Sequence, residues 1–70
     1  MAELNADDAD DLRYLADCSG RGARTAEQAA AATEDLTAKA MLCDLAENLR
    51  RTVRIATAIA DRIEKTGAGQ

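Results

Sequence analysis

The stretch from Thr25 to Lys65 constrains the fold most, because its forty-one residues contain neither proline nor glycine. These two residue types are the commonest helix breakers, so their absence favours helix throughout. In the second half of the stretch, apolar residues recur every three or four positions, which is the spacing of one helix face. They are Leu42, Leu45, Leu49, Ala56, Ile59 and Ile63. The chain is therefore predicted to be all-α.

The apolar pattern after Leu36 is wider than the seam of a two-stranded coiled coil. One heptad position holds Leu42, Leu49, Ala56 and Ile63, the other holds Leu45, Thr52 and Ile59, and Ala46, Val53 and Ala60 widen the stripe, with Met41 and Ile55 on its opposite flank. A stripe this broad suits a bundle in which the helix has more than one neighbour. We expect Leu42, Leu45, Leu49, Ile59 and Ile63 to form the core of an oligomer.

The small size of the chain supports the same expectation. Seventy residues allow a single domain, spanning residues 1–70, and a domain of that size leaves much of its surface wet. Much of the 47% hydrophobic content is alanine, and Tyr14 is the only aromatic residue. A monomer would have a thin core, so a homo-oligomeric helical bundle is predicted.

A short acidic helix is expected before the long one. Asn5 or Asp7 can cap it, and carboxylates are favoured in a first helical turn. This helix is predicted to run from about residue 7 to about residue 19, followed by a Gly-Arg-Gly loop in which Gly20 adopts the left-handed conformation. Thr25 and Gln28 have the spacing of a capping box that opens the second helix.

Two outcomes are open at Thr33, where a cap-type residue is followed by two acids. Either the chain kinks or turns there, or the helix continues for about 60 Å and projects from a globule whose expected diameter is about 28 Å. Residues 1–5 and 67–70 are expected to be disordered, with a glycine ending the last helix.

The composition argues against catalysis and against a resident metal or cofactor. The chain has no histidine for general base chemistry, and Cys18 and Cys43 alone cannot supply the four ligands of a zinc site. We expect both cysteines to be free thiols acting as small buried apolar residues. No signal peptide or membrane-spanning run is visible, so a cytoplasmic protein that does not contact membranes is predicted.

Charge is unevenly distributed along the chain. Residues 1–19 hold six acids and one base, whereas residues 48–70 hold five bases and two acids. Arg50 and Arg54 lie one helical turn apart, where they could clamp a phosphate or carboxylate, while Arg51 points elsewhere. The alternative is surface ion pairing, for which Glu47 and Arg51, and Asp61 and Lys65, have the favoured spacing.

Two resemblances bear on function. The run TAEQAAAATEDLT, residues 25–37, resembles the first helix and turn of a helix-turn-helix, although the following helix offers Lys39, Asp44 and Glu47 in place of a basic face. The small size, the tyrosine of the lead helix (Tyr14), and Arg24 and Thr25 opening the next helix resemble small phage proteins that assemble and sequester cyclic nucleotide immune signals.

The leading functional expectation is a non-enzymatic interaction module, an inhibitor or regulator, that binds itself and a partner such as a host protein. One alternative is an anti-defence sponge for a small anionic nucleotide held between subunits. The other is a DNA-binding regulator, which the net charge of −4 disfavours. The predicted ligand or partner residues are Tyr14, Arg21, Arg24, Thr25, Arg50, Arg51 and Arg54.

Overall fold

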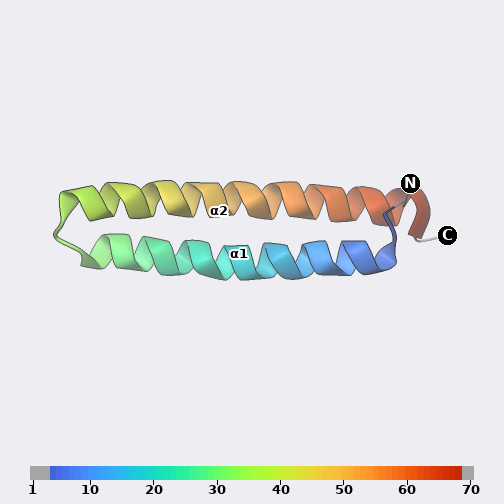
Figure 1. The fold of residues 1–70 in the computed structure, drawn as a ribbon, viewed down its shortest axis with the longest axis horizontal. Coiled ribbons are helices and arrows are strands. Elements are labelled where there is room, and N and C mark those ends of the chain that lie inside the picture. The colour runs from blue at the N-terminus through green and yellow to red at the C-terminus, as the bar shows by residue number, and fades with distance from the viewer. Residues whose placement is uncertain (1–3, 69–70) are drawn as a thin grey trace.

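The computed structural model describes residues 4–68, which form an antiparallel helical hairpin. Helix α1 spans Ala6–Ala32, helix α2 spans Leu36–Ile63, and a π-helical segment, η1, spans Glu64–Ala68. The two helices lie side by side over their whole length, with the start of α1 and the end of α2 at the same end of the hairpin (Figure 1). The molecule measures 52 × 18 × 16 Å. The all-α prediction is confirmed, since this described part contains no strand.

Helix α1 begins with a capping box. The Asn5 side chain accepts a hydrogen bond from the backbone N–H of Asp8 at 3.1 Å, and the Asp8 carboxylate accepts one from the backbone N–H of Asn5 at 2.9 Å. Two orphan N–H groups at the helix start are thereby satisfied. Asn5, one of the two predicted caps, is confirmed as the N-cap.

The predicted Gly-Arg-Gly loop is wrong, because Gly20 and Gly22 lie inside the continuous helix α1 and neither has a positive φ. The capping box at Thr25 is also wrong, since the Thr25 hydroxyl donates to the carbonyl of Arg21, one helical turn earlier. Glycine in a helix interior lowers helix stability by about 1 kcal/mol relative to alanine, but the packing of α1 along α2 outweighs this propensity.

The chain reverses at Thr33, so the turn was the correct one of the two outcomes left open there. The Thr33 hydroxyl accepts a hydrogen bond from the backbone N–H of Asp35 at 3.2 Å. The Asp35 carboxylate then accepts from the N–H groups of Thr37 and Ala38, at 3.0 and 3.2 Å, and caps α2. Two cap-type side chains therefore hold a connection of only three residues.

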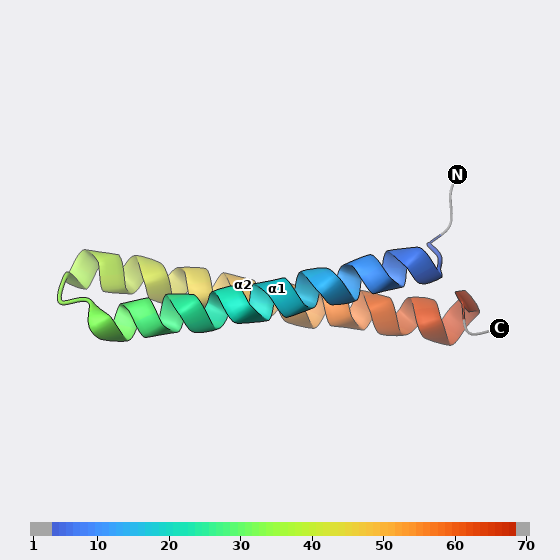
Figure 2. The ribbon, with the colours of Figure 1, turned by 90° about the horizontal axis from the view of Figure 1, so that it is seen from below.

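The seam between the helices is built almost entirely from small side chains. The buried residues recur at heptad spacing on both helices, and they are Ala9, Ser19, Ala23, Ala26 and Ala30 on α1, and Ala46, Ala56, Ala60 and Ile63 on α2. Small residues allow close approach of the helices, which cross at a shallow angle in Figure 2. They also remove little apolar area from water. The hairpin core is consequently thin.

The predicted glycine cap at the end of the last helix is not observed, because Gly67 lies within η1 and no described glycine has a positive φ. Of the residues expected to be disordered, Asn5 is the N-cap of α1, whereas residues 1–3 and 69–70 lie outside the described residues. Neither α1 nor α2 has the length of apolar sequence that a membrane crossing requires.

Candidate anion site and apolar face

One long side of the hairpin, the polar face, is defined by ion pairs that join α1 to α2. Arg13 of α1 donates to Asp61 at 2.8 Å and to Glu64 at 3.2 Å. Farther along, Nε of Arg50 donates to Glu27 at 3.0 Å. Because the hairpin brings α1 alongside α2, these carboxylates and arginines find partners across the two helices.

The predicted ion pairs within α2 are not observed. Asp61 pairs with Arg13 of the other helix, and neither Glu47 with Arg51 nor Asp61 with Lys65 is an ion pair between residues 4 and 68. A cross-helix partner was invisible to spacing arguments confined to one helix. The i,i+4 pair that does form is Asp17 with Arg21, at 3.1 Å.

The cross-helix contacts shift the affinity of these groups for protons. The hydrogen bond from Arg50 lowers the pKa of Glu27 below its ordinary value of 4.5, since it stabilises the carboxylate. The hydrogen bonds that Arg13 donates to Glu64 and Asp61 raise the pKa of Arg13. All these side chains are well exposed, so solvent screening keeps the contribution of each pair to stability small.

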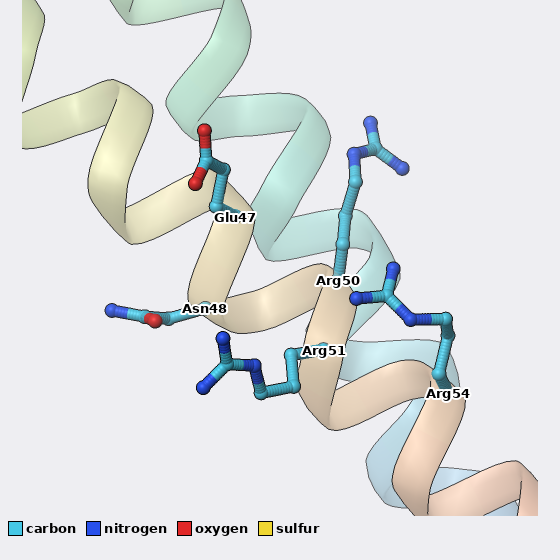
Figure 3. Close-up of a pocket in the computed structure, with 5 residues that line it drawn as sticks. All are labelled: Glu47, Asn48, Arg50, Arg51 and Arg54. Atoms are coloured by element: carbon cyan, nitrogen blue, oxygen red, sulfur yellow. The ribbon is translucent and has the colours of Figure 1, made fainter.

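Four arginines, Arg24, Arg50, Arg51 and Arg54, form the arginine cluster beside the Glu27 to Arg50 pair. A hollow of about 270 Å³ is lined by Arg50, Arg51 and Arg54 with Glu47 and Asn48 (Figure 3). A second, of about 290 Å³, is lined by Gly20, Arg24, Arg50, Val53 and Arg54. Arg50 and Arg54 line both hollows. In Figure 3, Arg51 extends away from Arg50, as predicted.

The remaining predicted ligand residues, Tyr14, Arg21 and Thr25, line neither of these two hollows. Tyr14 is 70% exposed on α1. Arg21 contacts Asp17 and the Cys18 sulfur, 3.6 Å away, and its carbonyl accepts the Thr25 hydroxyl hydrogen bond. No helix begins at Thr25, so the expectation that Arg24 and Thr25 open a second helix is wrong.

The cysteines differ from the buried apolar residues that we expected. Cys18 is half-buried and Cys43 is exposed, and both thiols are free. Within the described part of the chain, no three cysteine or carboxylate side chains are grouped so that they could hold a metal ion.

The side opposite the polar face is the apolar face, defined by Leu12, Leu15, Met41, Leu45, Ile55 and Ile59. Met41 is 66% exposed, Ile55 53%, and Leu45 and Leu15 almost half. Two shallow apolar hollows lie on this face. One, of about 200 Å³, is lined by Leu12, Leu15, Thr52, Ile55, Ala56 and Ile59, and the other, of about 490 Å³, by Ala38, Met41, Leu42 and Leu45.

The predicted oligomer core is divided between two surfaces of α2. Ile63 is buried in the hairpin, and Leu49 packs over Gly22 of α1. Leu45 and Ile59 line the apolar hollows, and Leu42 lies half-buried at the edge of the larger one. The width of the predicted stripe thus has a structural reason, since only part of it contacts α1.

From the sequence, Arg24 was expected at a helix start, and Arg50 and Arg54 were expected one helical turn apart. The structure brings all three together within one chain. The available signal was the turn at Thr33, because a reversal there places Arg24 alongside the middle of α2. No family model, curated protein or solved structure matches this chain.

Proposed function

We propose that the chain is a non-enzymatic interaction module that works as a homo-oligomer, with the apolar face of each hairpin covered by a second copy. The observation that carries this proposal is the apolar face itself, where Met41, Leu45 and Ile55 are each about half exposed or more. Contiguous exposed apolar surface marks an interaction site more often than isolated apolar residues do.

The accessible surface of the chain supports a partner of this size. A folded monomer of 7.4 kDa is expected to expose about 4200 Å², whereas this chain exposes 5268 Å². The excess of about 1000 Å² is comparable with the ~800 Å² that each partner buries in a standard protein interface. Its radius of gyration, 15.6 Å, likewise exceeds the roughly 11 Å expected of a compact domain of this length.

A second copy fits the apolar face because the face extends along α2 and has an apolar hollow toward each end, one of them lined by both helices. Two such faces related by a two-fold axis bury equivalent surfaces. The product is a four-helix bundle, in which the larger side chains of the apolar face supply the core that the alanine seam lacks.

In such an assembly the polar face and the arginine cluster stay on the outside, available to a further partner. This arrangement favours a regulator or inhibitor that works by presenting charged surfaces on a rigid bundle. The antiparallel packing gives no support to the helix-turn-helix alternative, whose two helices cross at about 90–120°.

Sedimentation equilibrium tests the assembly directly. We expect a mass of at least twice the 7.4 kDa of one chain at micromolar concentration, with dissociation on dilution. A folded monomer at that concentration, with cooperative thermal unfolding independent of protein concentration, would contradict the proposal.

A further inference from the structure

The arginine cluster gathers positive charge from two helices on a chain of net charge −4. Arg24 belongs to α1, whereas Arg50, Arg51 and Arg54 belong to α2. Arg24, Arg50 and Arg54 line one hollow together, although Arg24 is twenty-six residues from Arg50 in sequence. The antiparallel hairpin is what brings them to one place.

The charges around the cluster do not cancel. Its four arginines are accompanied by two carboxylates, Glu27 on Arg50 and Glu47 in the neighbouring hollow, which leaves two positive charges uncompensated. Across residues 4–68, Arg24, Arg51 and Arg54 take part in no ion pair. Their guanidinium groups keep their hydrogen-bond donors available to a ligand.

Glu27 holds Arg50 in position but accepts hydrogen bonds from only two of its three side-chain nitrogens. The carboxylate of Glu27 accepts from Nε and Nη2 of Arg50, so Nη1 stays free to donate. The floor of the Arg24 hollow is also open, because Gly20 has no side chain and a Cβ placed there would meet only Val53, at 3.9 Å. The hollow therefore combines a fixed donor with unoccupied space.

We propose that the arginine cluster binds a doubly charged phosphate group carried by a small molecule. Guanidinium forks match the oxygens of phosphate in pairs, and a dianion neutralises both uncompensated charges. A carboxylate ligand would leave one of those charges unpaired. The site goes beyond the proposed assembly, because it lies within one chain and away from the apolar face.

The test is calorimetric and NMR titration of the full chain with inorganic phosphate and pyrophosphate, with acetate as the carboxylate comparison, at low ionic strength. We expect saturable binding of both phosphate probes and much weaker binding of acetate. Arg24→Gln and Arg54→Gln should each weaken pyrophosphate binding about tenfold, the effect of losing one charge-assisted hydrogen bond.

Arg62→Gln is the matched control, since it removes the same charge from α2 about 12 Å along the helix from Arg54. It should leave the affinity within about twofold. Arg54→Lys keeps the charge but loses the fork, so several-fold weakening is expected. Circular dichroism and sedimentation of each variant establish that the hairpin and its assembly are retained.

Three results would overturn the site. The first is the absence of saturable binding of phosphate and pyrophosphate. The second is an affinity for acetate equal to that for the phosphate probes. The third is equal weakening of pyrophosphate binding by Arg62→Gln and Arg54→Gln, which would show that binding depends only on net charge. The oligomeric state, measured separately, decides the assembly proposal whichever result is obtained.

Discussion

The two long faces of the hairpin lie on either side of one alanine seam, but their side chains differ in chemistry and in exposure. The polar face is closed by hydrogen-bonded ion pairs from Arg13 and Arg50 to carboxylates on the opposite helix. The apolar face has large side chains, such as Met41 and Ile55, that no part of the described chain covers. Because only the apolar face leaves large apolar side chains exposed, the two faces should respond differently to the same kind of change.

The largest effect is expected from a charge on the apolar face. Ile55→Asp would place an unpaired carboxylate in the core of the proposed four-helix bundle, and it should abolish that assembly and lower the free energy of unfolding by about 3 kcal/mol. Sedimentation and urea denaturation measure both effects. Ala58→Asp adds the same charge at an exposed position of the same helix and should change little. Equal behaviour of the two variants would remove the difference between the faces.

The next effect concerns the seam that the faces share. Ala60 is fully buried and belongs to the same apolar cluster as Ala9 and Ile63. Ala60→Leu should push the helices apart and destabilise the fold by about 2 kcal/mol, the typical cost of overpacking. Thermal unfolding followed by circular dichroism measures it, with Ala58→Leu as the exposed control. A stabilised Ala60→Leu variant would show that the seam is loosely packed.

A smaller effect of opposite sign is expected from the two glycines inside α1. Gly20→Ala should stabilise the fold by about 1 kcal/mol, since the helix gains propensity and the new Cβ meets Val53 at an ordinary 3.9 Å. Gly22→Ala should gain less, because its Cβ would approach Leu49 to 3.3 Å. Urea denaturation of both variants measures the difference. A larger gain at Gly22 would contradict the tighter packing there.

The smallest effects belong to the ion pairs of the polar face. Arg13→Gln and Glu27→Gln should each lower the free energy of unfolding only slightly, and the loss should shrink as salt is added. Because folding lowers the pKa of Glu27, the unfolded chain binds more protons near its ordinary value of 4.5. The stability from this pair is therefore present above that pH and is lost as pH falls through the lower folded pKa.

Unfolding free energies measured between pH 3 and pH 7 test the sign, with Glu27→Gln as the control that lacks the titrating group. The difference in stability between the natural chain and this variant should narrow as the pH falls. A difference that grows on acidification would contradict the assigned direction.

Local signals identified the Asn5 cap and offered the reversal at Thr33 as one of two outcomes. The predicted helix ends near residue 19 and at Gly67, and the predicted helix start at Thr25, are wrong. The Asn5 cap and the reversal at Thr33 both depend on a side chain and its immediate neighbours, so sequence spacing was sufficient. The glycines at positions 20 and 22 were misjudged because their helical conformation depends on α2, which lies across the seam. A run of small residues at heptad spacing through this region was the overlooked signal.

The candidate site was likewise predicted only where it depends on residues of a single helix. That Arg50 and Arg54 share a helix face followed from their spacing alone. That Arg24 joins them depends on where the reversal at Thr33 places α1 along α2, which the spacing of residues on one helix does not show. The same dependence explains why Asp61 pairs with Arg13 in preference to Lys65.

The alanine seam has a consequence for helix register. One alanine resembles the next, so sliding α1 along α2 by seven residues, about 10 Å, would again set small side chains against small side chains. The ion pairs are not interchangeable in this way, because such a slide would carry Arg13 away from Asp61 and Glu64. Each pair contributes little to stability, yet together with the short turn they distinguish the native alignment from its translated copies. The ion pairs of the polar face therefore specify the register of α1 against α2.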